Sequence, residues 1–242
     1  MSGIIPEIVM SAKEINIFHK NLHINSTVLS TLKQLPVNTS FKNSLIMVYY
    51  VIRKGRPCDC GALFRLINET AEFSHQKKHP GSDDRDTTVE TSEEILRRDA
   101  FAEHPLFSFF VVECYFSKEQ LNKNDRGEII GFSTFNEMYS IYKGKSGYMS
   151  GMFVSSKHRG NSLAPVLFKT TAKACLDAGC KSLMWGVSRW NFGGKTFYQK
   201  LGAINMTDRE QREFMTLNHQ NLTKLAEEYQ PSTCGGVEIL YR

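Results

Sequence analysis

The chain has 242 residues, of which 41% are hydrophobic and 23% are charged, and these values are ordinary for one globular domain with appendages. The net charge of +5 is mild and the basic residues are scattered, so we expect no nucleic-acid partner. Because no run of about 18 apolar residues occurs and the N-terminus has no signal-peptide pattern, we expect neither a membrane partner nor secretion. The six cysteines lack the spacing of a zinc site, which favours reduced thiols, a cytoplasmic location and no bound metal.

Apolar periodicity and turn residues divide most of the chain into elements. Residues 1–46 carry scattered apolar positions between Asn, Ser and Thr, and we interpret them as an N-terminal extension. The next elements are a strand over 45–52, a helix with its apolar stripe over 63–71, a loop over 75–88, a helix that begins after a capping signal at 91–94 and ends at Ala100, a strand over 107–112 and a hairpin connection over 117–126. They are followed by strands over 128–135 and 148–154, a helix with its apolar face over 164–175, a strand over 182–187, a helix over 194–201, a strand over 214–217 and a last helix over 222–229.

Helices come early and late in this order, around three consecutive central strands. Consecutive strands joined by short connections pair antiparallel, whereas a helical crossover joins parallel strands. The order therefore predicts an α/β layered domain with a mixed sheet.

One stretch, from Val154 to Pro165, combines the end of a strand, a basic turn and the start of a helix. Unpaired N–H groups and the helix dipole both favour an anion at such a point. Taken alone, the same stretch is equally well a solvated basic turn.

The residues of this stretch resemble the acyl-CoA signature of the GNAT N-acetyltransferases, in Met152-Phe153-Val154 followed by Arg159-Gly160-Asn161-Ser162-Leu163-Ala164. Within that superfamily the sequence is most similar to the diamine (spermidine/spermine) and thialysine N-acetyltransferases. Further landmarks follow in the family order: Tyr50-Val51-Ile52-Arg53, Asp99-Ala100-Phe101-Ala102-Glu103-His104-Pro105, Ile129-Ile130-Gly131-Phe132, Trp190-Asn191 and Phe197-Tyr198-Gln199-Lys200-Leu201-Gly202-Ala203.

The resemblance covers residues 47–229 and leaves an N-terminal extension, 1–46, and a C-terminal tail, 230–242. It implies a single GNAT-type α/β layered domain, with a mixed, mostly antiparallel central sheet flanked by helices. It also implies acetyl-CoA as cofactor, a primary amine as acceptor and a homodimer.

The same resemblance assigns cofactor-binding residues. The strand backbone would pair with the pantetheine arm, and the N–H groups of the turn would take the pyrophosphate, with added charge from Arg159. The family has glycine at the position of Ser162, so we expect the Cβ there to alter the turn. The residues so implied are Met152, Phe153, Val154, Arg159, Gly160, Asn161, Ser162, Leu163, Ala164, Pro165, Asn191 and Tyr198.

Tyr198 lies where the family places the group that protonates the departing thiolate, and a phenol with an ordinary pKa of about 10 can do so. By spacing alone, Tyr198 is an aromatic residue on the buried face of a short helix. The resemblance also implies that Asn191 hydrogen-bonds the cofactor near the same place.

The acceptor side departs from the family. Acidic family positions fall here on Ser74, Ser140, Ser150 and Gly151, whereas Glu210 keeps an acid. We expect Ser74, Ser150 and Glu210 to contact the acceptor, and Glu210, the nearby alternative Glu137 or water to deprotonate it. For each glutamate, a solvated surface carboxylate is an equally good interpretation.

The function predicted is therefore acetyl-CoA-dependent N-acetylation of a primary amine on a small molecule, of the diamine, polyamine or thialysine-like kind. With the family acids missing, an amine smaller or less charged than spermidine or spermine fits better. Two alternatives stay open: a protein or peptide N-acetyltransferase, and a catalytically degenerate acyl-CoA-binding module.

Overall fold

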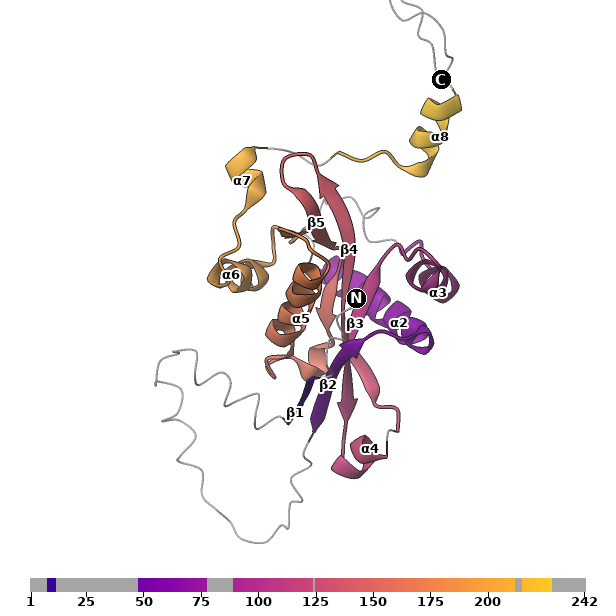
Figure 1. Cartoon of the computed structure of the whole chain (residues 1–242), viewed down its shortest axis with the longest axis vertical. Helices are drawn as coiled ribbons and strands as arrows, with labels where there is room; N and C mark the ends of the chain where they lie inside the picture. Colours follow the sequence, from indigo (N-terminus) through magenta and orange to yellow (C-terminus); the bar gives the residue numbers. More distant parts are fainter. Residues whose placement is uncertain (1–7, 12–47, 78–88, 124, 212–214, 228–242) are drawn as a thin grey trace, which may run out of the picture. The chain divides into compact units, whose positions relative to one another are not determined.

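The computed structural model describes residues 8–11, 48–77, 89–123, 125–211 and 215–227 (Figure 1). The chain forms two compact units, Met1–Trp190 and Asn191–Arg242. The first unit holds the sheet, and the second holds α6 (Phe192–Lys200), α7 (Met206–Glu210) and α8 (His219–Glu227). None of the helices in these described ranges is long and apolar enough to cross a membrane.

A mixed, mostly antiparallel sheet forms the centre of the first unit. Its strands are β1 (Ile8–Ser11), β2 (Tyr49–Lys54), β3 (Ser108–Tyr115), β4 (Glu128–Ser140), β5 (Gly144–Met149), β6 (Met152–Val154) and β7 (Leu183–Trp185). The first five pair antiparallel in sequence order, β7 joins β5 in parallel, and β6 pairs with β4. With helices packed on this sheet, the structure confirms the predicted fold class.

Three helices of the first unit pack on the two faces of its sheet (Figure 1). α2 (Cys60–Lys77) and α3 (Glu93–Phe101) bury their apolar residues with Phe109 and Val111 of β3. α5 (Leu163–Asp177) packs on the opposite face with Phe110 and Val112. Because successive strand residues point to opposite faces, the unbroken apolar run of β3 supplies both cores.

β1 is not predicted by the sequence pattern. It pairs with β2 from Ile8 opposite Ile52 to Ser11 opposite Tyr49. Four apolar or small residues carry too little periodicity to identify a strand, and the edge of β2 provides the missing partner. Residues 1–7 and 12–47, which include the rest of the extension, lie outside the described residues.

Several other elements differ in the structure from those predicted. The connection predicted over 117–126 contains α4 (Lys118–Asn122), whose N-cap is the Ser117 hydroxyl. β4 is longer than predicted because its second half pairs with β5 as a hairpin. The strand predicted over 214–217 is wrong at residues 215–217, which are in no strand, because a short apolar run forms a strand only beside a partner. Residue 214 and the part of the predicted loop from 78 to 88 lie outside the described residues.

A buried ion-pair network ties β2 and β3 to the start of α2. The guanidinium of Arg53 lies 2.7 Å from an oxygen of Asp59 and 2.7 Å from an oxygen of Glu113. Asp59 ends the short 3-10 helix Pro57–Asp59 that leads into α2, and it also accepts the N–H of Arg56 at 2.8 Å. The network therefore fixes the origin of the helix that lies over the cavity described below.

Candidate active site

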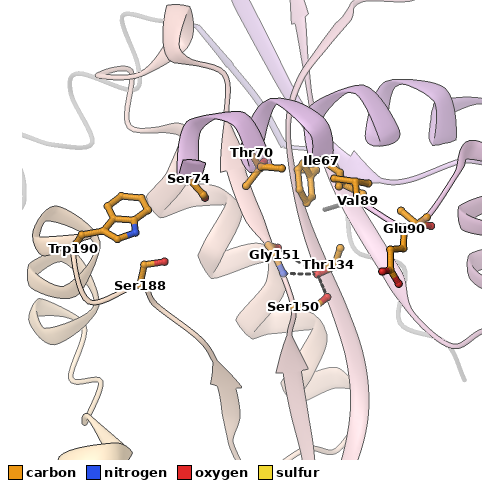
Figure 2. A pocket seen from close by; sticks show the side chains of 13 residues that line it. Ile67, Thr70, Ser74, Val89, Glu90, Thr134, Ser150, Gly151, Ser188 and Trp190 are labelled. Carbon is orange, nitrogen blue, oxygen red and sulfur yellow. Dashed lines mark hydrogen bonds between the residues drawn. The ribbon is translucent and has the colours of Figure 1, made fainter. Parts of the chain in front are cut away.

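The strand predicted over 148–154 is interrupted at Ser150 and Gly151. Thr134 of β4 holds the interruption: its N–H donates to the Gly151 carbonyl at 2.9 Å, and its hydroxyl accepts the Gly151 N–H at 2.9 Å. The Thr134 and Ser150 hydroxyls are 2.8 Å apart (Figure 2). Because of this interruption, β5 continues beside β7 whereas β6 stays with β4.

The separation of β6 from β5 leaves one edge of β6 without a neighbouring strand among the described residues. The Gly151 carbonyl accepts from Thr134, and the Ser155 N–H donates to Ile130, so these residues face β4. Backbone groups alternate along a strand, and those of Met152 and Val154 therefore point the other way. No strand in the described part of the chain pairs with that edge. An amide-bearing ligand can bind there as an additional strand.

The turn after β6 presents backbone N–H groups at the start of α5. Gly160 has a φ of +85°, and a Cβ placed on it would meet nothing within 4 Å. Ser162, the N-cap of α5, has a φ of 58° and its side chain caps none of the described N–H groups. The first N–H groups of a helix need partners from outside the helix, and the helix dipole makes an anion a good one. Ser162 is thus a non-glycine residue in the left-handed region, and an effect of its Cβ on the turn stays a prediction.

Two side chains of this turn are held by the protein itself. The Arg159 guanidinium lies 4.3 Å from the centroid of the Phe73 ring, and its Nε donates to the Val154 carbonyl at 3.0 Å. The Asn161 amide donates to the Tyr50 hydroxyl at 3.3 Å, which ties the turn to β2. The Arg159 guanidinium is stacked on the Phe73 ring of α2, and it therefore adds positive charge beside the turn.

A cavity of about 600 Å³ lies beside the interruption between β5 and β6 (Figure 2). Ser74 and Ser150, predicted to contact the acceptor, both line it, although they are far apart in the sequence. Whether they contact an acceptor stays a prediction. The full lining is Ile67, Thr70, Ala71, Ser74, Val89, Glu90, Thr91, Phe132, Thr134, Ser150, Gly151, Ser188 and Trp190.

Glu90 is the charged member of the cavity lining, and sequence reasoning missed it. It follows a polar stretch predicted as a loop, and its only local signal is its place just before the capping sequence of α3. Glu137, the predicted alternative base, is not among the lining residues and lies 2.8 Å from Lys145 on the β4–β5 hairpin. Ser140 closes the same hairpin opposite Gly144.

The other predicted site residues lie in the second unit. Asn191 is the N-cap of α6 and accepts the Gly194 N–H at 2.9 Å. Tyr198 lies in α6 with its ring centroid 5.0 Å from that of Phe197, and burial raises the pKa of Tyr198 to about 12. Glu210 ends α7 and is exposed. The roles predicted for Asn191, Tyr198 and Glu210 stay predictions.

Comparisons with known proteins agree with this architecture. The model of the acetyltransferase (GNAT) family matches residues 74–203. The thialysine N-epsilon-acetyltransferase of Bos taurus is 30% identical over 165 residues, which cover 68% of this chain and 89% of that protein. The spermidine/spermine N(1)-acetyltransferase-like protein 1 of Homo sapiens is 23% identical over 180 residues, which cover 74% of this chain and 24% of that protein.

Among solved structures, an integron cassette protein from V. cholerae superposes with a TM-score of 0.54 at 22% sequence identity. The match covers 74% of this chain and 98% of that chain, and it supports the fold alone. The resemblance seen in the sequence is confirmed by the family model and by the curated relatives. Because the family model spans more than half of its residues, the chain belongs to the acetyltransferase (GNAT) family and is an N-acetyltransferase.

Proposed function

We propose that this enzyme transfers an acetyl group from acetyl-CoA to a primary amine of a small molecule, of the diamine, polyamine or thialysine-like kind. One observation carries the proposal: the open edge of β6 and the cavity meet at Gly151, which both precedes β6 and lines the cavity. A donor bound along the strand and an acceptor bound in the cavity would therefore be neighbours. Such proximity is a large part of the catalysis of a two-substrate reaction.

The residues present fit acetyl-CoA. The backbone of Met152 and the N–H of Val154 offer hydrogen bonds to the amides of the pantetheine arm, while the Val154 carbonyl accepts from Arg159. The turn from Gly160 to Ala164 offers N–H groups to the pyrophosphate. The space around Gly160 leaves room for phosphate to approach the backbone. GNAT acetyltransferases use acetyl-CoA as acetyl donor, and the thioester supplies the acetyl group when the cofactor is bound.

Two proton movements complete the reaction: the amine must be neutral when it attacks, and the departing sulfur must be protonated. We assign the second to the Tyr198 hydroxyl. With a pKa of about 12, this phenol keeps its proton at neutral pH and can donate it to the sulfur. For the first, Glu210, Glu137 or water stays the predicted base.

The proposal is tested by measuring thiol release from acetyl-CoA with a panel of small amines, peptides and no acceptor. We expect release with small amines. In the Tyr198→Phe variant we expect kcat to fall about 10²-fold or more, with an unchanged Kd for acetyl-CoA in titration calorimetry, because general acid catalysis contributes on that order. Tyr139→Phe, on the exposed part of the hairpin, is the control and keeps full activity.

Full activity of the Tyr198→Phe variant would remove Tyr198 from the mechanism. Release with peptides alone would instead identify a protein or peptide acetyltransferase, and cofactor binding without release would identify a degenerate acyl-CoA-binding module. The homodimer implied by the resemblance is part of the same proposal, and light scattering of the purified chain tests it.

A further inference from the structure

The cavity has two chemically different ends. Glu90 and Val89 lie at the opposite side from Ser188 and Trp190 in Figure 2. Ser150 and Gly151 lie between them in Figure 2, at the point where β6 begins, next to the open strand edge. An acetyl donor bound along β6 would place its reactive end near Gly151, between the two ends, so Glu90 would lie to one side of the place of reaction.

Glu90 has no partner among the residues that the structure describes: no hydrogen bond or ion pair joins it to them. Two acids of the elements that line the cavity are, by contrast, already engaged. Glu69 of α2 accepts the Ser155 hydroxyl at 2.8 Å, and Glu137 of β4 pairs with Lys145. Glu90 is also solvent-exposed, so it stands where a ligand can reach it from an open side of the cavity.

Between the two ends, the cavity wall is uncharged in the described residues. It consists of hydroxyl groups, such as those of Thr70 and Ser74, and of apolar surface such as Phe132. Hydroxyl groups can orient a ligand, but they do not neutralise a cation that leaves bulk water. A positive group bound in this cavity is therefore stabilised most strongly beside the carboxylate of Glu90.

From this arrangement we infer that Glu90 is a specificity-determining residue that binds a second cationic group of the acceptor, away from the amine that is acetylated. This inference rests on the proposed function and deepens it. The enzyme accordingly prefers an acceptor with two positive groups over one that has only the reacting amine. Glu90 does not take part in the proton transfers.

The test compares kcat/KM for 1,5-diaminopentane and for 1-aminopentane, which differ by the second ammonium alone. The native enzyme prefers the diamine. In the Glu90→Gln variant, kcat/KM for the diamine falls about 10-fold to 100-fold, as expected for the loss of a charged hydrogen bond, and that for the monoamine is unchanged. Glu119→Gln, which removes an exposed acid of α4 outside the cavity, leaves both values unchanged.

Charge reversal gives a gain of function. The Glu90→Lys variant is expected to favour 5-aminopentanoate over 1,5-diaminopentane, because the distal carboxylate of this acceptor now finds a cation. The native preference should also weaken as salt is raised, since the pair is exposed to solvent.

Several results would overturn the inference. An equal loss of kcat for both acceptors in Glu90→Gln, with a shifted pH profile, would make Glu90 a base for the reacting amine. An unchanged diamine preference would mean that other groups bind the second cation. Absence of acetylation of every amine by the native enzyme would instead refute the proposed function itself.

Discussion

The buried network around Arg53 allows a quantitative prediction. Replacing Arg53 with Met keeps the length of the apolar stem but removes the cation between Asp59 and Glu113. The side chains of all three residues are 5–7% exposed, so water does not replace the lost partner. Each carboxylate keeps one N–H donor, from Arg56 at 2.8 Å and from Gly127 at 2.9 Å.

Removing one partner of a buried ion pair costs about 3–5 kcal/mol, because the remaining charge stays buried. We expect the Arg53→Met variant to lose that much free energy of unfolding in urea denaturation monitored by circular dichroism. The matched control is Arg98→Met. The Arg98 guanidinium is also 2.7 Å from a carboxylate, that of Asp99, but its side chain is 72% exposed, so we expect a far smaller loss of stability than in Arg53→Met.

The pH dependence gives a second check. Burial alone would raise the pKa of Asp59, but the hydrogen bonds of Arg53 and of the Arg56 N–H, with their charges, outweigh it, and the pKa lies below its usual range. The stabilisation by Asp59 is therefore present above the unfolded pKa of about 3.9 and is lost as pH falls through the lower folded pKa. Without Arg53 the buried carboxyl is protonated more readily.

The stability difference between native protein and Arg53→Met should accordingly shrink as the pH falls below about 4. If Arg53→Met lowered the free energy of unfolding at neutral pH by no more than Arg98→Met does, the network would not stabilise the fold as its burial indicates. A difference that stayed constant into the acid range would exclude Asp59 as the group responsible.

Two glycine-related predictions concern other parts of the fold. Ser162→Gly should raise the free energy of unfolding by about 0.5–1 kcal/mol in denaturant titration, because Ser162 holds a left-handed φ of 58° without a capping bond; a loss of stability would contradict this. Gly147→Ala should cost about 1–3 kcal/mol, since the new Cβ would lie 2.6 Å from both Cys175 Sγ and Phe135 Cε2. Gly186→Ala, with nothing within 4 Å, is the control for Gly147→Ala, and equal stability of these two variants would refute the packing argument.

Features that depend on a few neighbouring residues could be predicted from the sequence. Ser92 was part of a predicted capping signal, and its hydroxyl does accept the Ile95 N–H at the start of α3. The apolar run of β3 and the basic turn before α5 were likewise predicted, since strand burial and helix starts depend on neighbouring residues. The family resemblance added the acyl-CoA signature to these local patterns.

Features that depend on partners distant in the chain could not be predicted in this way. The interruption at Ser150 and Gly151 depends on hydrogen bonds from Thr134, and β1 exists as a strand beside β2. The residues around Ser150 and those of β1 do not by themselves indicate that Thr134 and β2 are their partners.

By itself, then, the sequence determined the fold class, the family and the turn that suits the cofactor, because short-range patterns and motif residues carry that information. Only the tertiary structure decided that Glu90 shares a cavity with Ser74 and Ser150. The physical reason is that the walls of this cavity come from α2, the loop before α3, β4 and the segments around β6 and β7, which sheet pairing and helix packing bring together. A lone glutamate before a helix has no local pattern that would reveal such neighbours.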